Sequence, residues 1–391
     1  MFAGSLRASP FVAFAPADAP RAAPLLSPIN QRRVATFTAN RRAVWSLWLF
    51  LALFLLTLVS ELIANDRPLI ASYKGELLFP AVVNYPESKF GGFLAQTIYR
   101  DPFISDEINA NGWMIWPPIR YGDATVDESL GTSAPAAPWW VLSDDVRCSR
   151  YPAGTADPAC KDVGNLHWLG TDDQGRDVVA RLFYGFRISV IFGILLTIAS
   201  SIIGVVVGAL QGYFGGWTDL IGQRLLDIWG SMPTLYVLLI VSSVLAPGFW
   251  VLLAILIVFS WTALVGIVRA EFLRARNAEY VAAARALGLT NIRIMTRHLL
   301  PNAMVATLTF MPFIAGGSVS TLTALDFLGL GMPAGTPSLG ELLNQGKQYL
   351  FAPWLSLTSF TVIGIILLLF VFIGEGVRDA FDPRRTFAGR T

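Results

Sequence analysis

Histidine and cysteine are scarce in this 391-residue chain, which contains two residues of each. His167 and His298 lie far apart and no cysteine cluster accompanies them, so the sequence offers no ligand set typical of zinc. We expect no metal site and no bound cofactor. A phosphate-binding loop of the form G-x-x-x-x-G-K-[ST] is also missing, because Gly346-Lys347 lacks the earlier glycine and the following hydroxyl residue. If ATP drives this protein, another chain binds the nucleotide.

Charged residues are equally few. They make up 14% of the chain against 54% hydrophobic residues, and the mean hydropathy is +0.55. This balance excludes an ordinary soluble globular protein and predicts an all-α polytopic membrane protein. The net charge of +2 is too small to indicate a partner, and nothing suggests nucleic acid.

Six apolar stretches are long enough to span a bilayer. They cover residues 44–64, about 188–210, about 225–245, about 249–268, about 304–325 and about 357–373. The tail of residues 1–43 contains six arginines and one acid, and arginines recur in the segment 377–391. The positive-inside rule therefore places both termini in the cytosol. Pro233 is expected to kink the third span.

Residues 65–186 form a long insert between the first two spans, on the predicted outer side of the membrane. Its start predicts two strands around a turn at Lys74-Gly75. Near its end, five apolar residues fall on one helical face: Val178, Val179, Leu182, Phe183 and Phe186. We expect a helix lying along the outer membrane surface, with the core face of the external lobe as the alternative.

A polar, arginine-rich segment, residues 277–302, separates two spans on the predicted cytosolic side. Asn277 is a candidate N-cap, and the Ala/Leu-rich run that follows has high helix propensity. Gly288 is expected to end this helix in the left-handed conformation. Thr290 can cap a second short helix, which Pro301 is expected to close before the next span.

Helix, glycine turn and helix also describe a DNA-binding motif, with Arg285, Arg293 and Arg297 as phosphate contacts. The nearby spans argue against this, because they hold the segment at the bilayer and away from a major groove. A third hypothesis is a plain cytosolic loop whose arginines only set the orientation of the chain.

The segment resembles the cytoplasmic EAA loop of binding-protein-dependent ABC importer permeases, through Ala282, Ala283, Ala284, Gly288, Leu300 and Pro301. Two positions depart from that pattern: Ala282 replaces the glutamate of the motif, and His298 replaces an isoleucine. Glu279, nearly one turn away, could take over the glutamate's role. The residues that this resemblance assigns to ATPase coupling are Glu279, Ala282, Ala283, Ala284, Gly288 and Pro301.

The resemblance extends from about residue 170 to about residue 383 through GTDDQGRD, GYFGGWTD, EYVAAARALG, RHLLPN, LDFLGLGMPAGTPSLGELL and VRDAFDP. It implies the type I ABC importer permease fold, with six transmembrane helices and a core of residues 187–376. The long insert is similar to that of Yej-type permeases, which take up oligopeptides and the peptide-nucleotide antibiotic microcin C. The implied partners are a second permease subunit, two ATPase subunits, a periplasmic peptide-binding protein and the inner-membrane lipid.

The resemblance implies a permease, which is not an enzyme. Two other classes of membrane protein are alternatives to it. A membrane enzyme could use the insert as a catalytic lobe, but His167 is the lobe's one histidine and no nucleophile motif stands near it. A secondary transporter would carry carboxylates for coupling ions near the membrane midplane and would show internal repeats, and neither is evident.

Cys148 and Cys160 share the insert, and on the outer side of the membrane they are expected to form a disulfide. A bridge closing so short a loop should contribute about 2–3 kcal/mol to local stability. Mass spectrometry of non-reduced protein should find the two residues in one linked peptide pair. Two free thiols in freshly prepared protein would refute this prediction.

Overall fold

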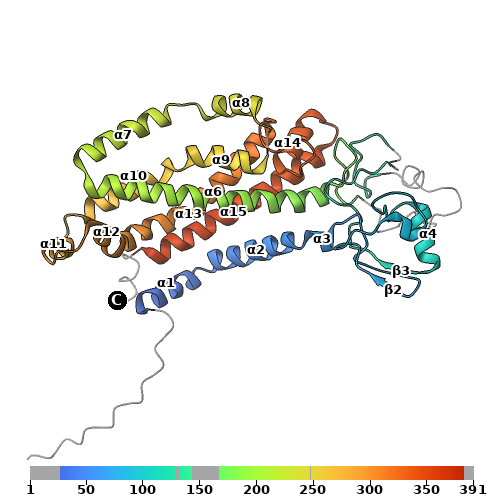
Figure 1. The fold of residues 1–391 in the computed structure, drawn as a ribbon, viewed down its shortest axis with the longest axis horizontal. Coiled ribbons are helices and arrows are strands. Elements are labelled where there is room, and N and C mark those ends of the chain that lie inside the picture. The colour runs from blue at the N-terminus through green and yellow to red at the C-terminus, as the bar shows by residue number, and fades with distance from the viewer. Residues whose placement is uncertain (1–26, 129, 131, 143–166, 247, 383–391) are drawn as a thin grey trace, which may run out of the picture.

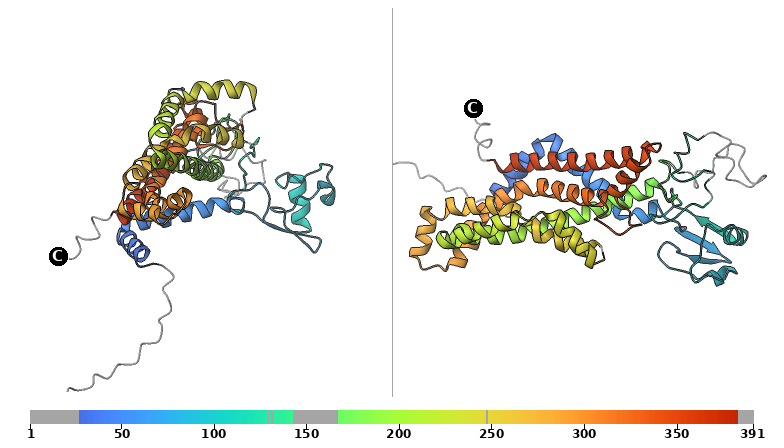
Figure 2. Two further views of the ribbon diagram at one scale, coloured as in Figure 1. Left: turned by 60° about the vertical axis from the view of Figure 1, so that its left-hand side comes forward. Right: turned by 90° about the horizontal axis from the view of Figure 1, so that it is seen from above.

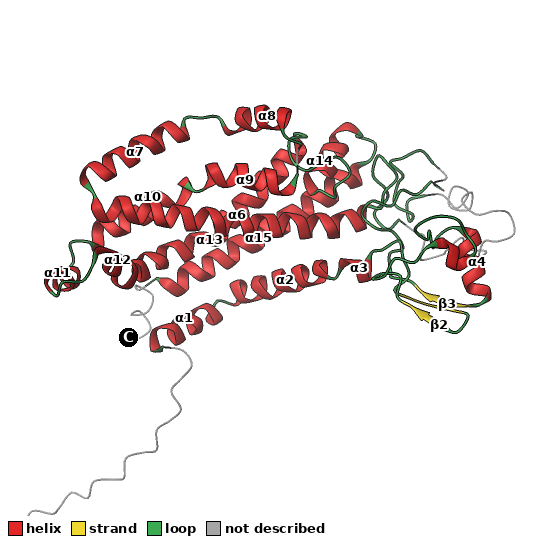
Figure 3. Cartoon of the chain, viewed as in Figure 1, coloured by secondary structure: helices red, strands yellow, loops and turns green. Residues whose placement is uncertain are grey.

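The computed structural model of this chain describes residues 27–128, 130, 132–142, 167–246 and 248–382. Long helices lie side by side in an elongated bundle, and a smaller lobe with short strands stands at one end of it (Figure 1, Figure 3). Two further views show the lobe extending beyond the bundle (Figure 2). The bundle confirms the prediction of an all-α membrane protein.

Five helical segments in the described part of the chain are long and apolar enough to cross a membrane. They are α2 (Arg41–Leu58), α6 (Val178–Phe214), α9 with α10 (Phe249–Ser260 and Thr262–Ala275), α12 with α13 (Asn291–Ile294 and Leu300–Phe327) and α15 (Pro353–Phe381). A sixth span arises if α7 (Gly216–Gly230) and α8 (Thr234–Val244) are counted together, although they are bent by 67°. Pro233 directly precedes α8, at the break where a kink was expected.

Shorter helices flank the spans. α1 (Pro28–Ala39) precedes the first span, α3 (Ser60–Ile63) follows it, and α14 (Leu339–Gln348) lies between α13 and α15 in the chain. α11 (Glu279–Ala286) precedes α12 at the end of the bundle opposite the lobe (Figure 1). The two ends of the bundle therefore differ: one carries the lobe, and the other carries α11 and α12.

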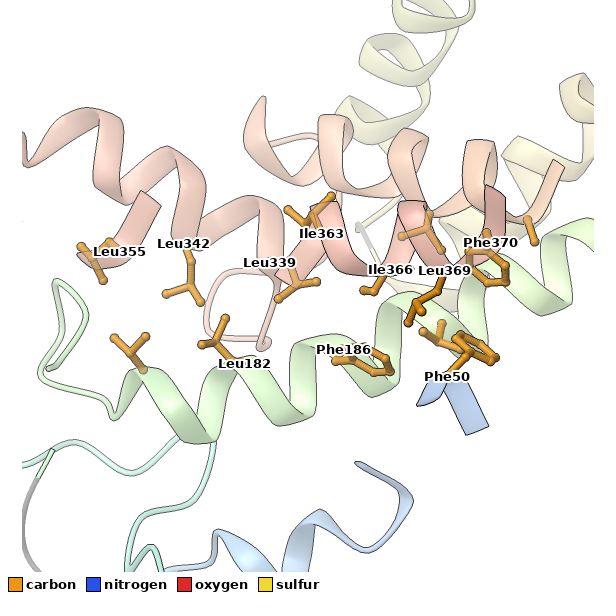
Figure 4. Close-up of a cluster of buried hydrophobic side chains, with 14 of the residues drawn as sticks. Phe50, Leu182, Phe186, Leu339, Leu342, Leu355, Ile363, Ile366, Leu369 and Phe370 are labelled. Atoms are coloured by element: carbon orange, nitrogen blue, oxygen red, sulfur yellow. The ribbon is translucent and has the colours of Figure 1, made fainter. Parts of the chain in front are cut away.

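The main core joins α6 to α14 and α15. Leu182 and Phe186 of α6 face Leu339 and Leu342 of α14 and a row of α15 side chains (Figure 4). The prediction of a helix along the membrane surface was wrong, because α6 is one helix from Val178 to Phe214 and its first turns are buried in this core. Periodicity identified the apolar face correctly but not the surface that covers it.

Three glycines one turn apart let α6 approach α10 closely. A Cβ at Gly204, Gly208 or Gly212 would lie only 2.5, 2.7 and 2.6 Å from the backbone oxygens of Trp261, Val265 and Arg269. Such small-residue repeats bring helix backbones together in membranes, where packing replaces the hydrophobic effect as the driving force. The spacing was visible in the sequence, but we did not identify it.

The lobe is built on a three-stranded antiparallel sheet in the order β2–β1–β3. β1 (Ile70–Tyr73) pairs with β2 (Glu76–Leu78) across Lys74 and Gly75, both of which have positive φ, so the predicted hairpin is confirmed. β3 (Gly112–Ile115) pairs on the other side of β1, and α4 (Pro102–Ala110) together with the 3₁₀ turn Glu87–Phe90 covers the sheet. Cys148 and Cys160 lie outside the described residues, so their disulfide stays a prediction.

The glycine contact between α6 and α10 generates a prediction. Gly208→Val would push a side chain against the Val265 carbonyl, and overpacking of this kind costs about 1–3 kcal/mol. We expect a lower midpoint of thermal unfolding for the purified protein. Gly266→Val on α10 is the matched control, because a Cβ there meets nothing within 4 Å. Equal midpoints for the two variants would contradict the close-packing role.

Candidate functional site

The segment 277–302 folds as two helices joined by a glycine turn, as predicted. Gly288 has φ +76° and donates its N–H to the Arg285 carbonyl at 2.9 Å, while Leu289 donates to the Ala284 carbonyl at 3.2 Å. This pair of bonds is the Schellman motif, which satisfies carbonyls at the end of a helix and requires a left-handed residue. We call residues 279–294, comprising α11, the turn and α12, the coupling unit.

The N-cap prediction was wrong. α11 begins at Glu279, the N-cap position is held by Ala278, and no side chain caps the helix. Asn277 lies one residue too early, because α10 ends in turns that run directly into α11. Thr290 does occupy the N-cap position of α12, but its side chain makes no capping hydrogen bond.

Pro301 does not close the second helix. A π-helical turn from Met295 to Leu299 joins α12 to α13, and the helix continues through Pro301 to Phe327. Proline lacks an N–H and its ring crowds the carbonyl four residues earlier, and a wider π turn at that place relieves both problems. The coupling unit is therefore attached to α13 without a break.

Apolar contacts and one tyrosine hold the coupling unit on the bundle. Val281, Ala284 and Ile294 are at most 4% exposed and pack in one cluster with α6 and α10. The hydroxyl of Tyr213, near the end of α6, donates to Asn291 Oδ1 at 2.7 Å. The Arg285 guanidinium lies 5.4 Å from the centre of the Tyr213 ring. The unit is thus tied to α6 through both of its helices.

The residues predicted for ATPase coupling do not all share one face. Glu279, Ala282, Ala283, Gly288 and Pro301 are exposed, whereas Ala284 is buried against the bundle. Ala284 therefore anchors the unit on the bundle. The sequence analysis missed Leu287 and Ile292, which are 82% and 75% exposed at the tip of the unit. The sequence feature that could have identified them is the presence of apolar residues on both sides of a glycine turn in a polar segment.

This arrangement is suited to docking. Large apolar side chains left in solvent on a helical protrusion favour a groove on a partner protein. Among the described residues, no group of three or more His, Cys, Asp or Glu could hold a metal ion.

At the other end of α6, two buried arginines join the insert, α6 and α14. Arg176 Nε binds Asp172 Oδ2 at 2.7 Å, and Arg181 Nη2 binds Glu341 Oε2 at 2.6 Å. Arg181 Nη2 also donates to the Thr336 carbonyl at 3.1 Å. Arg176 also lies 3.5 Å from Glu341, and Arg181 lies 3.4 Å from Asp172. Since Arg176 and Arg181 are at most 2% exposed, their charges are stabilised by these protein partners and not by water. The GTDDQGRD string is therefore a structural junction.

His167 completes this junction. Its Nδ1 lies 2.8 Å from Asp177 Oδ2 and its Nε2 lies 3.0 Å from Asp127 Oδ2, with the ring only 1% exposed. Tyr121 also donates to Asp127 Oδ2 at 3.0 Å. Burial alone lowers the pKa of His167, but the hydrogen bonds to Asp127 and Asp177 outweigh it and raise the pKa above its ordinary value of 6.5. A charged imidazole can donate to both carboxylates at once.

Comparison with known proteins places these features among transport permeases. Residues 202–387 match the family model described as binding-protein-dependent transport system inner membrane component. The chain is 65% identical to the peptidoglycan transport system permease protein YejE of Agrobacterium fabrum, over 93% of this chain and 95% of that protein. It is 52% identical to the inner membrane ABC transporter permease protein YejE of Escherichia coli, over 92% and 98% of the two chains. The oligopeptide transport system permease protein OppC of Bacillus subtilis is 35% identical over 60% of this chain and 78% of its own length.

The His167 contacts predict a pH dependence of stability. Because the folded pKa is raised, the contribution of His167 is complete below about pH 6.5 and is lost as the pH rises through the folded pKa. We expect the midpoint of thermal unfolding to fall as the pH rises above about 6.5, and His167→Gln should flatten this decline. His298→Gln is the control, and a decline of the same slope in all three proteins would contradict the assignment.

Proposed function

Since the chain belongs to the YejE family of inner-membrane ABC transporter permeases, we propose that it forms half of the translocation pathway of an ATP-driven importer of oligopeptides and peptide-like compounds. The type I importer permease fold and the inner-membrane, multi-pass location follow from the family. Importers of this family are driven by ATP, and their complexes contain ATPase subunits and a substrate-binding protein. The finer assignments below rest on particular residues.

The exposed tip of the coupling unit is the observation that carries the proposal. Leu287 and Ile292 would enter a groove on an ATPase subunit, with Glu279, Ala282 and Ala283 lining the same contact. The buried face, through Val281, Ala284 and Ile294, would pass any displacement to α6, α10 and α13. A packed helix pair moves as a body, so a displacement caused by docking at the tip would be transmitted to the transmembrane helices.

A second permease subunit would complete the pathway. α7 has no buried residue and α8 has only Leu238. Large apolar side chains on the two helices are 47–79% exposed: Leu220, Ile221, Leu225, Ile228, Leu235, Tyr236, Leu239, Ile240 and Val244. Polar contacts such as the Asp219–Arg269 ion pair hold α7 on the bundle, but the bent α7–α8 pair buries almost none of its apolar side chains, so we propose that it packs on the partner. A heterodimer with two ATPase subunits and a periplasmic peptide-binding protein is the assembly that we infer.

The substrate class follows from the relatives' names. One is a peptidoglycan transport permease and another an oligopeptide transport permease, and peptide bonds are the chemistry that these substrates share. We therefore propose peptides and peptide-bearing cell-wall fragments as the principal substrates, with the peptide-nucleotide microcin C as a further candidate. Reconstituted complexes supplied with each labelled compound and ATP would rank them.

The two alternatives find less support. For a membrane enzyme with a catalytic lobe, His167 would have to be available as a base, but both of its ring nitrogens bond buried carboxylates. A secondary transporter would have no use for a docking tip that carries Leu287 and Ile292 on the cytosolic side. Uptake that proceeds without ATPase subunits would revive this second alternative.

Gly288 provides the sharpest test of coupling. Its φ of +76° strains a β-branched residue, so Gly288→Val should cost about 1–3 kcal/mol locally and misdirect the tip of the unit. Asparagine tolerates the left-handed conformation, so Gly288→Asn should retain most of the function. We expect peptide-stimulated ATP hydrolysis and transport to fail in the valine variant and to persist in the asparagine variant.

The control is Gly364→Val on α15, where a Cβ meets nothing within 4 Å and φ is not positive. If Gly288 merely ends a helix, its replacement by valine would reduce the yield of complex without changing the activity of each complex. Transport must therefore be normalised to the amount of assembled complex. Wild-type transport per assembled Gly288→Val complex would defeat the coupling assignment.

A further inference from the structure

The lobe carries an apolar turn, residues 79–83, directly after β2. The sequence from Leu77 to Val83 contains no polar residue. The N–H groups of Val82 and Val83 both donate to the Phe79 carbonyl, at 3.1 and 2.9 Å, so the backbone of the turn is closed on itself. Val82 is 84% exposed, and Phe79 and Val83 are exposed beside it. The fold therefore leaves three large apolar side chains uncovered at one place.

The path of the strands brings this turn back to the end of the first span. The chain continues from β3 to Ile119, whose N–H donates to the Ile63 carbonyl at 3.0 Å and whose carbonyl accepts from Asn65 N at 3.1 Å. β3 therefore runs toward the end of α3, and its antiparallel neighbour β1 runs away from it. Because β2 is antiparallel to β1, it returns in the direction of the span and ends in the apolar turn.

A pocket of about 290 Å³ relates the turn to the membrane. Its walls include Ala81 of the turn, Glu61 of α3 and Tyr184 of α6. Glu61 also pairs with Arg187 of α6 at 3.7 Å. Tyrosines and snorkelling arginines are typical of the boundary where the apolar part of a span meets the lipid headgroups. Since Val82 directly follows Ala81, the apolar turn lies at this boundary.

The lipid-facing surface of the first span extends to the same level. Leu58, Val59 and Leu62, at the end of α2 and in α3, are all exposed on the bundle. The apolar turn adds to this surface at the level of Glu61. α7 and α8 lie along the opposite edge of the bundle from α2 and the strands of the lobe (Figure 1). The second permease subunit that we propose to pack on α7 and α8 would therefore leave the turn uncovered.

We propose that the apolar turn is a membrane anchor, which inserts Phe79, Val82 and Val83 into the leaflet on the lobe's side of the bilayer. Lipid is the partner that fits, because the turn lies at the headgroup level and continues the lipid-facing surface of the first span. An apolar surface of this kind enters the boundary between headgroups and acyl chains without crossing the membrane. The lobe is then held at two places, by the ionic junction around Arg181 and by the turn, so it cannot swing away from the bilayer.

Spin labels on the full-length chain in phospholipid nanodiscs test this proposal. With Cys148 and Cys160 replaced by serine, single labels are introduced through Val82→Cys, Lys74→Cys and Leu49→Cys. Lys74, at the far turn of the β1–β2 hairpin, is the aqueous reference, and the exposed Leu49 of α2 is the lipid reference. Oxygen concentrates in lipid and a nickel complex in water. We expect the ratio of oxygen to nickel collision rates to be severalfold higher at position 82 than at position 74.

Two results of this experiment would overturn the proposal. Equal ratios at positions 82 and 74 would place the turn in water. Protection of position 82 from both reagents would indicate that a protein covers the turn.

A charge placed in the turn should release it from the membrane. Val83→Asp adds a carboxylate that is costly in lipid, so the ratio at position 82 should fall to that at position 74. Trp113→Asp is the matched control and should leave the ratio unchanged, because Trp113 is as exposed as Val83, at 46%, but lies toward the distal end of β3. An unaltered ratio in the Val83→Asp protein would refute the anchor.

A second measurement keeps both cysteines. The photoreactive residue p-benzoylphenylalanine in place of Val82 should form adducts with phospholipid when the membrane-embedded protein is irradiated, and mass spectrometry of the labelled peptide identifies the adduct. The same residue in place of Lys74 should form no lipid adduct. Adducts with polypeptide alone at position 82 would overturn the lipid assignment.

Discussion

The close approach of α6 to α10 is the constraint on which the rest of this structure depends. Backbone can meet backbone there only because Gly204, Gly208 and Gly212 have no side chains. This contact brings α10 beside α6, and the two helices then form most of the surface on which the coupling unit rests. The same α6 packs on α14 and α15 through Leu182 and Phe186 (Figure 4). One helix thus organises both the core and the site.

Each end of α6 is attached to another part of the protein, and the two attachments differ in their chemistry. At one end, Tyr213 fixes the coupling unit through a single hydrogen bond and an arginine contact. At the other end, Arg181 and Asp177 belong to a buried ionic junction that fixes the insert and α14. The first joint combines this hydrogen bond with apolar packing, whereas the second contains paired charges whose separation would be costly. One continuous helix connects the two joints.

Sequence patterns predicted what local chemistry dictates. Gly288 was placed correctly because few residues tolerate a left-handed helix end, and the Lys74-Gly75 hairpin followed from its turn residues. The errors at Asn277, at Pro301 and in the surface helix share one cause: each depended on what the neighbouring helix did next. Leu287 and Ile292 were missed because exposure is a property of the packed unit, and the partners of His167 lie 10 and 40 residues away in the chain. Tertiary contacts of this kind leave no periodic trace.

α6 is longer than the membrane requires. Its 37 residues span about 55 Å, whereas the hydrocarbon of a bilayer is about 30 Å thick. Roughly 25 Å of helix therefore projects from the apolar layer and is divided between its two ends. The buried charges of Arg181 and the polar contacts of Tyr213 fall in these projecting turns, so neither has to enter lipid during biogenesis. Insertion can be completed on the apolar middle of the helix alone, and the ionic junction and the coupling unit can assemble afterwards in water.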